Sequence, residues 1–191
     1  MMSNKLKLGF GICGSFCTHA QMLCVMEQLS EKYDIYPVLS EISSSTDTRF
    51  GSKEDLKRKI EDLTKRSIIT SIKDAEPLGP VTKLDAMLIC PCTGNTLAKF
   101  AHGITDSAVT MASKATARCG KPVILSLASN DALGANLQNI GLLYNKKNVY
   151  FVPVSQDDSV KKPYSLVCDF SKVEETVALA LQGEQIQPFL K

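Results

Sequence analysis

The sequence predicts an α/β fold in which a doubly wound parallel sheet lies between two layers of helices. Two observations predict it: strand-length segments are apolar throughout, and helix-length segments separate them along the chain. Strands that are apolar on both faces indicate a parallel sheet that is covered on both sides. The chain has 191 residues, an ordinary length for one domain, and shows no linker or internal repeat. We therefore expect a single domain over residues 1–191.

The first half of the chain supplies two strands and two helices. Residues 6–13 are apolar and contain glycine, which predicts a buried first strand, and 19–29 show the apolar periodicity of a helix. A second, short strand is expected at 35–39. Residues 43–52 are rich in Ser, Thr and Asp and are expected to form a loop. The sequence S-K-E-D then begins a helix over 52–66, because acidic residues favour a helix N-terminus.

The second half continues the alternation of strands and helices. A compact apolar strand is expected at 86–90, followed by a polar turn at 91–96 and a helix of small residues that ends near Gly120. The next strand covers 122–127, and 130–143 form a turn and a helix. The last two expected elements are a strand at 149–154 and a helix at 173–181.

Charge and hydropathy argue against two classes of protein. Lys plus Arg (22) nearly balances Asp plus Glu (20), and the formal charge of +2 lacks the strong basic footprint of a dedicated nucleic-acid binder. The longest apolar runs are strand-sized and too short to span a bilayer. Residues 1–5 lack the apolar core of a signal peptide. We therefore expect a cytoplasmic protein that binds neither nucleic acid nor a membrane.

The seven cysteines are expected to be reduced thiols rather than a disulfide framework, because the chain shows no secretion signal. The C-P-C sequence at 90–92 and the pair Cys13 and Cys17 do not match a zinc site with paired ligands, and no nearby histidine completes either one. Most of the cysteines are expected to pack as small buried hydrophobic residues, and no metal site is expected.

Glycine and small polar residues recur at four expected strand ends. Gly11 and Gly14 flank the turn after the first strand, and Ser15 lies near the N-terminus of the next helix. Backbone amides and a hydroxyl in this position suit a phosphate without any Lys or Arg. The other polar residues at strand ends are Ser40, Thr93, Asn95, Thr96, Ser126, Ser129 and Asn130. Because parallel sheets bind ligands at the carboxyl ends of their strands, this recurrence predicts a ligand cleft.

Each of these loops has a second interpretation when it is taken alone. The spacing of Gly11 and Gly14 matches neither a Walker loop nor a complete dinucleotide fingerprint, so a simple tight turn also explains it. Asn95 or Thr96 is suited to capping the following helix, and Ser and Asn are ordinary turn residues. The repetition at several strand ends favours the cleft.

Three segments resemble a known family. The sequence PCTGNTLAKFAHG at 91–103, followed by Asp106, resembles the signature of the flavoprotein superfamily that contains flavin prenyltransferases and cysteine decarboxylases. Residues 127–133 are similar to that family's P-x-M-N-x-x-M segment, of which Asn130 remains, and 136–154 resemble its closing segment. The resemblance covers nearly the whole chain and implies a flavodoxin-like, or Rossmann-like, three-layer fold.

The resemblance also implies a cofactor, an assembly and site residues. The cofactor is FMN, held between subunits of a trimer-based homo-oligomer that could extend to a dodecamer. Asn130 matches the asparagine that handles substrate in the decarboxylases, so it is a catalytic candidate. The residues expected to bind the cofactor are Gly11, Gly14, Ser15, Ser40, Thr93, Thr96, Ser126 and Ser129.

Departures from the family pattern bear on the reaction. The decarboxylases carry a catalytic histidine on the helix after the second strand, whereas 53–66 contain none. The prenyltransferases use an Arg-Glu pair where this chain has Ser129 and Asn130, so the cation for a prenyl phosphate is missing. The resemblance instead implies an oxidoreductase subunit for a small cyclic dicarboxylate, with NADP on a partner subunit. A stand-alone flavin decarboxylase or prenyltransferase, or a non-catalytic binding subunit, remains the alternative.

Few other side chains are candidates for acid–base or anion-binding roles. His19, at the start of a helix that keeps its ring neutral, either moves a proton in the cleft or packs in the structure. His102 is expected to make a structural hydrogen bond. Lys99 is either an anion ligand or a solvated helix residue. Lys161, Lys162 and Tyr164 follow the last expected strand and form either a cover over a dicarboxylate or a mobile surface loop.

Overall fold

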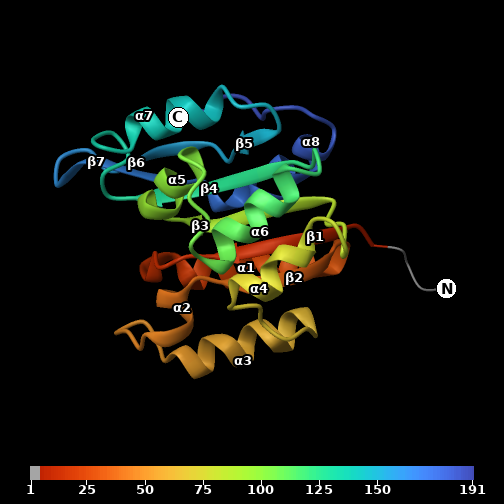
Figure 1. Cartoon of the computed structure of the whole chain (residues 1–191). Helices are drawn as coiled ribbons and strands as arrows, with labels where there is room; N and C mark the ends of the chain where they lie inside the picture. The colour runs from red at the N-terminus through yellow and green to blue at the C-terminus, as the bar shows by residue number, and fades with distance from the viewer. Residues whose placement is uncertain (1–4) are drawn as a thin grey trace.

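The computed structural model describes residues 5–191, so residues 1–4 of the expected leader-free N-terminus lie outside it. A seven-stranded sheet forms the centre of the molecule (Figure 1). Its strands are β1 (Lys7–Ile12), β2 (Asp34–Leu39), β3 (Ala86–Cys92), β4 (Val123–Ser129), β5 (Val149–Phe151), β6 (Val154–Asp158) and β7 (Lys162–Cys168). The first five strands run parallel in the order β2-β1-β3-β4-β5, which is the flavodoxin-like order.

Helices cover both faces of this sheet, which completes the three layers (Figure 1). The helices α1 and α8 pack against each other and the sheet on one face, whereas α6 packs on the other beside α4 and α5. The helices are α1 (His19–Lys32), α2 (Glu41–Ser45), α3 (Lys53–Thr64), α4 (Ile72–Ala75), α5 (Gly94–Ala101), α6 (Ala108–Ala117), α7 (Leu137–Tyr144) and α8 (Val173–Leu181). Strands β3 and β4 are buried along their whole length, as their apolar sequences predict. The predicted fold class is therefore confirmed.

Three expected elements differ from the structure. The expected loop at 43–52 begins inside the short helix α2. The small-residue helix expected to run to Gly120 is two helices, because Gly103 has a positive φ of 73° after α5 and Ser107 starts α6 with a capping box. The expected strand at 149–154 divides into β5 and the start of β6.

A β-hairpin that the sequence analysis missed extends the sheet beyond β4. Strands β6 and β7 pair antiparallel, and β7 also pairs antiparallel with the end of β4, so the sheet is only mostly parallel. The hairpin turn is held by the Asp158 carboxylate, which accepts hydrogen bonds from the backbone amides of Val160 and Lys161. Lys161, Lys162 and Tyr164 therefore belong to this ordered hairpin rather than to a loop after the last strand.

The direction in which strands are added to the sheet reverses between β1 and β3. The chain places β2 on one side of β1, and it then returns to place β3 on the other side. Such a switch point opens a crevice at the carboxyl ends of the two strands. Among residues 5–191, no helix is both long and apolar enough to cross a bilayer. The same residues contain no group of three or more His, Cys, Asp or Glu side chains arranged to hold a metal ion.

Candidate functional site at the strand ends

Two adjoining hollows lie at the carboxyl ends of the parallel strands. The first, which we call the helix-end hollow, has a volume of about 400 Å³ and lies beside the N-termini of α5 and α6. It is lined by Cys13, Gly14, Ser40, Glu41, Ile42, Thr93, Asn95, Thr96, Lys99, Asp106 and Ser107. The loops after β1, β2 and β3 all contribute, which is the arrangement that the switch point predicts.

The second, which we call the hairpin hollow, has a volume of about 430 Å³ and extends to the β6–β7 hairpin. Its lining comprises residues 14–18, Arg49, Phe50, residues 93–95, residues 128–131, Asp157, Lys162 and Val167. Gly14, Thr93 and Asn95 line both hollows, so the two adjoin at these residues. Each volume falls in the range of about 300–1,000 Å³ that is usual for small-molecule sites.

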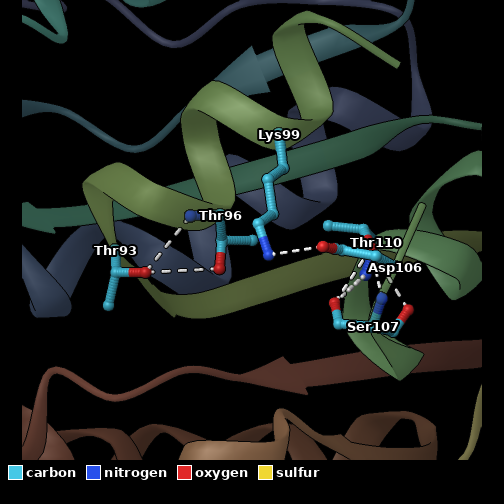
Figure 2. A network of polar contacts seen from close by, with 6 residues as sticks. All are labelled: Thr93, Thr96, Lys99, Asp106, Ser107 and Thr110. Carbon is cyan, nitrogen blue, oxygen red and sulfur yellow. Dashed lines mark hydrogen bonds and ion pairs between the residues drawn. The ribbon is translucent and has the colours of Figure 1, made fainter. Parts of the chain in front are cut away.

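Two helix N-termini border the helix-end hollow. Thr93 caps α5, with its hydroxyl accepting a hydrogen bond from the Thr96 amide at 3.3 Å and donating one to the Thr96 hydroxyl at 3.2 Å (Figure 2). Ser107 caps α6 in the same way, through the Thr110 amide at 3.2 Å. Two helix N-termini thus border one hollow through their capping residues Thr93 and Ser107, and each carries the positive end of its helix dipole.

One lysine lies in this hollow with a carboxylate partner. Lys99 Nζ contacts Asp106 Oδ2 at 2.8 Å, and the lysine side chain is 28% exposed (Figure 2). The hydrogen bond from Lys99 lowers the pKa of the Asp106 carboxyl below its usual value. Lys99 is therefore neither unpaired nor fully solvated, because Asp106, which lies shortly before α6, holds it at the edge of this hollow.

The floor of the helix-end hollow contains a buried thiol. Cys13 Sγ lies 3.2 Å from the Thr96 hydroxyl, and burial raises the pKa of Cys13 to about 11. A thiol with such a pKa stays protonated near neutral pH and is a poor nucleophile. Cys90, Cys92 and Cys168 are buried as well, whereas Cys17, Cys24 and Cys119 are exposed. Four of the seven cysteines are thus buried, as expected for most of them, and the other three are exposed.

A chain of polar side chains, which the sequence analysis missed, supports the end of β4. The Ser129 hydroxyl donates to Asp131 Oδ1 at 2.6 Å, and the Asn136 amide donates to both carboxylate oxygens at 2.9 Å. Asn139 in turn donates to Asn136, and the His102 ring lies 3.1 Å from Asn139 Oδ1. Hydrogen bonds from Ser129, which has the largest effect, and from Asn136 lower the pKa of the Asp131 carboxyl. The expected structural role of His102 fits this contact.

The start of α5 packs directly on that chain. A Cβ atom on Gly94 would lie 2.6 Å from Ser129 Oγ and from Asn136 Nδ2, and 2.8 Å from Asp131 Oδ1. Only glycine allows such close approach. The density of Asn and Asp in residues 130–139 was the signal in the sequence that such a network exists, because these side chains bond readily to their neighbours.

Most of the predicted site residues come together at these two hollows. Those that line one or both are Gly14, Ser15, Ser40, Thr93, Thr96, Ser129 and Asn130. The hydroxyl of Ser40 contacts Ser43, and Asn130 is exposed at the end of β4. Thr93 itself, rather than Asn95 or Thr96, caps α5.

Gly11 and Ser126 do not line either hollow. A Cβ on Gly11 would lie 2.9 Å from side-chain atoms of Met87 and Val109, so this glycine serves packing between β1, β3 and α6. Ser126 is fully buried within β4, where its hydroxyl lies 2.9 Å from Cys168 Sγ. Both residues lie too deep in the sheet to touch a ligand in the hollows.

His19 lines neither of the two hollows but a third one, which shares Phe16, Cys17 and Phe50 with the hairpin hollow. Its Nε2 donates to the Cys13 carbonyl at 2.9 Å, since a carbonyl can only accept, and its ring packs edge-on against Phe16. Burial lowers the pKa of His19. The ring lines a smaller hollow of about 180 Å³ between α1 and α3. These contacts describe a packed histidine that fixes the turn after β1, which is the second of its two expected roles.

Similar proteins were found at the level of family, sequence and structure. The chain matches the Flavoprotein family over residues 1–189. It is 45% identical over 185 residues to the B subunit of dipicolinate synthase from Bacillus subtilis, covering 96% of this chain and 92% of that protein. Residues 11–20 and 126–141 already resemble this protein when the sequence is taken alone.

Solved structures agree with this assignment. The B subunit of dipicolinate synthase from Bacillus halodurans superposes with a TM-score of 0.90 at 44% identity, covering 99% of this chain and 97% of that one. The FMN-dependent cysteine decarboxylase SpaF superposes with a TM-score of 0.69 at 24% identity, covering 93% and 95%, and shares the fold. Because the family match spans almost the whole sequence, the chain belongs to the Flavoprotein family.

Proposed function

We propose that the chain binds FMN in the two joined hollows and acts as a B-type subunit of dipicolinate synthase in a sporulating bacterial cell. The observation that carries the proposal is that a hollow bordered by two helix N-termini adjoins a second hollow of similar volume at Gly14, Thr93 and Asn95. A long ligand with a phosphate at one end and a ring at the other matches that shape. The identity of 45% to a B subunit supports the reaction.

The donors present fit the parts of FMN. Thr93, Thr96 and Ser107, together with the amides at the start of α5 and α6, would hold the phosphate, with Ser40 beside them. Neutral hydroxyls and amides suffice there, because two helix dipoles already favour negative charge. Ser15, Ser129 and Asn130 would border the ring in the hairpin hollow. Gly14 leaves room between the two parts.

The proposed reaction is the oxidation of dihydrodipicolinate or hydroxytetrahydrodipicolinate to the aromatic dipicolinate. Bound FMN would supply a two-electron acceptor for this change: the hydroxytetrahydro compound first loses water, and the dihydro ring then loses one hydride equivalent and one proton. The exposed amide of Asn130 orients the substrate at the end of β4, where Asp131 and Asn136 hold the loop in place. His19 lines neither hollow and receives no proton-transfer role.

A partner subunit and a homo-oligomer complete the proposal. The chain has no dinucleotide fingerprint, so an A subunit is proposed to bind NADP as the final electron acceptor. A trimer-based assembly of this chain would close the hollows from outside, as the resemblance to the family implies. One flavoprotein domain over residues 1–191 is sufficient for these roles.

A reconstitution experiment tests the proposal. The freshly purified protein should be yellow and should release FMN on denaturation. Mixing it with the A subunit, the cyclic substrate and NADP should then produce dipicolinate faster than the A subunit alone, followed by the absorbance of the pyridine product. A colourless protein with no affinity for FMN, or an A subunit that is equally active alone, would contradict it.

A further inference from the structure

One arginine of this chain lacks the carboxylate partner that the others have. Arg58 pairs with Asp55, Arg66 with Asp34 at 2.7 Å, and Arg118 with Glu76 at 2.5 Å. Arg49 makes no ion pair with any of the residues that the structure describes, which include every arginine in the sequence. Its guanidinium lies 4.9 Å from the centre of the Phe50 ring, and both residues line the hairpin hollow.

The segment that carries Arg49 is held by hydrogen bonds at its base. The amide of Thr48 donates to the Gly51 carbonyl at 3.0 Å, and the amide of Gly51 donates back to Thr48 at 3.1 Å. The Phe50 amide also donates to the Thr48 hydroxyl at 3.1 Å, and the Lys53 amide donates to Asp47 at 2.9 Å. Arg49 and Phe50 thus form the tip of a tight turn, whose backbone is positioned before any ligand arrives.

A second cation reaches the same hollow from a different element. Lys162, the first residue of β7, lines the hairpin hollow together with Asp157, with which it pairs. The hydrogen bond with Asp157 raises the pKa of the lysine, so it stays charged. An ammonium group has three donors, and Asp157 is its one ionic partner among the described residues. Lys162 can therefore pair with a ligand carboxylate while it keeps Asp157.

The other charged groups of the hollow are already satisfied. Asp131 points its oxygens at Ser129 and Asn136, and Asp157 is paired with Lys162. Arg49, Lys162, Asp131 and Asp157 together carry no net charge, so an anionic ligand has to be held by direct contacts rather than by long-range attraction. The rings of Phe16 and Phe50 add flat apolar surface to the same lining.

We infer that Arg49 and Lys162 determine substrate specificity by holding the two carboxylates of a planar cyclic dicarboxylate in the hairpin hollow. This inference rests on the proposed function and names the residues that recognise its substrate. The guanidinium of Arg49 pairs with one carboxylate in the two-pronged geometry that suits this group, and Lys162 pairs with the other. Phe16 and Phe50 border the ring between them.

The test compares two ligands that differ by one carboxylate. Binding of pyridine-2,6-dicarboxylate and of pyridine-2-carboxylate to the FMN-loaded protein is measured by calorimetry for wild type, Arg49→Gln, Arg49→Lys and Lys162→Gln. Arg58→Gln removes an exposed arginine on α3, outside both hollows, and serves as the matched control. FMN affinity and the oligomeric state are measured for each variant.

Wild type should bind the dicarboxylate more tightly than the monocarboxylate. Arg49→Gln should weaken dicarboxylate binding by roughly tenfold to a hundredfold and reduce the preference for it, because a charge-assisted pair is lost. Arg49→Lys should recover part of the loss, and Arg58→Gln should behave as wild type. In the reconstituted enzyme, the KM for substrate should rise more than kcat falls.

Two results would overturn the inference while leaving the proposed function intact: an unchanged dicarboxylate preference in Arg49→Gln, or a loss explained entirely by a changed oligomeric state. A wild-type protein that binds both ligands equally would overturn it as well. Failure of the proposed function has a different signature, namely no bound FMN and no effect of this chain on the A subunit.

Discussion

His19 shows how a polar side chain can serve the fold rather than the chemistry. The residue is 8% exposed, and its ring bonds to the carbonyl of Cys13, directly before the glycine that lines both hollows. A neutral ring in this position donates through Nε2 and holds the turn after β1. The residue therefore supports the turn next to the site without contacting a ligand. Substituting it should change the stability of the protein rather than the rate of the reaction.

We expect His19 to make the protein less stable in mild acid. Burial lowers its pKa in the folded state, so the unfolded chain takes up a proton first as the pH falls below about 6.5. The free energy of unfolding should fall from there toward the lowered pKa, with a slope of at most about 1.4 kcal/mol per pH unit from this residue. Urea denaturation of wild type and His19→Gln at several pH values measures the effect.

The His19→Gln variant keeps a donor for the Cys13 carbonyl but cannot be protonated. Its stability should change less than that of wild type between about pH 7.5 and 5.5, since the carboxylates titrate alike in both proteins. Identical pH profiles would mean that the folded protein accommodates the charged ring. FMN binding should survive the substitution, because His19 lines neither hollow.

At the scale of elements, the N-terminus of α5 joins the two halves of the site. Thr93 caps the helix on the side of the helix-end hollow, and Gly94 packs against Asp131 and its partners below the hairpin hollow. The backbone can approach so closely only because Gly94 has no Cβ. A change at this one position should therefore disturb the helix end and the loop after β4 together.

Gly94→Ala should destabilise the protein by about 1–3 kcal/mol, because the added methyl overlaps three fixed polar atoms in a packed region. Gly141→Ala is the matched control: Gly141 lies inside α7, and a Cβ there meets nothing within 4 Å. This control should stabilise the protein by up to about 1 kcal/mol through helix propensity. Chemical denaturation compares the two variants, and equal effects would show that the space beside Gly94 relaxes easily.

The elements that sequence patterns predicted best are those with continuous apolar runs. Strands β1, β3 and β4 are buried along almost all their length, so their sequences show little besides hydrophobic residues. Strand β6 has the sequence VSQDD with only Val154 buried, and its partner β7 begins with three exposed residues. Such a polar hairpin has no period-two signal, so it could not be predicted from hydrophobicity.

At the scale of the whole molecule, local sequence patterns predicted only part of the site. Glycine and small polar residues at strand ends predicted the helix-end hollow, because the carboxyl ends of parallel strands meet at one edge. Arg49, Phe50 and Lys162 were not predicted as neighbours, since they come from a loop before α3 and from the unpredicted hairpin. These residues lie close together only because of long-range packing, which no local sequence pattern predicts.

If one ligand occupies both hollows, FMN and riboflavin should stabilise the protein to different extents. FMN at about 100 times its Kd should raise the free energy of unfolding by about 2.7 kcal/mol. Riboflavin lacks the phosphate, so it cannot bond to the amides and hydroxyls at the starts of α5 and α6. It should therefore stabilise the protein much less at the same concentration. Thermal denaturation with each ligand measures the difference.

Two serine variants locate that difference in the helix-end hollow. Ser107→Ala and Ser52→Ala each remove a helix cap, so each should cost about 1 kcal/mol of stability without ligand. Only Ser107 lines the helix-end hollow. Only Ser107→Ala should therefore reduce the difference between the stabilisation by FMN and the stabilisation by riboflavin. If the two flavins stabilise wild type equally, the phosphate is not held by these helix ends. The joined hollows would then have to hold the ring alone, and the anion-binding half of the site would need another ligand.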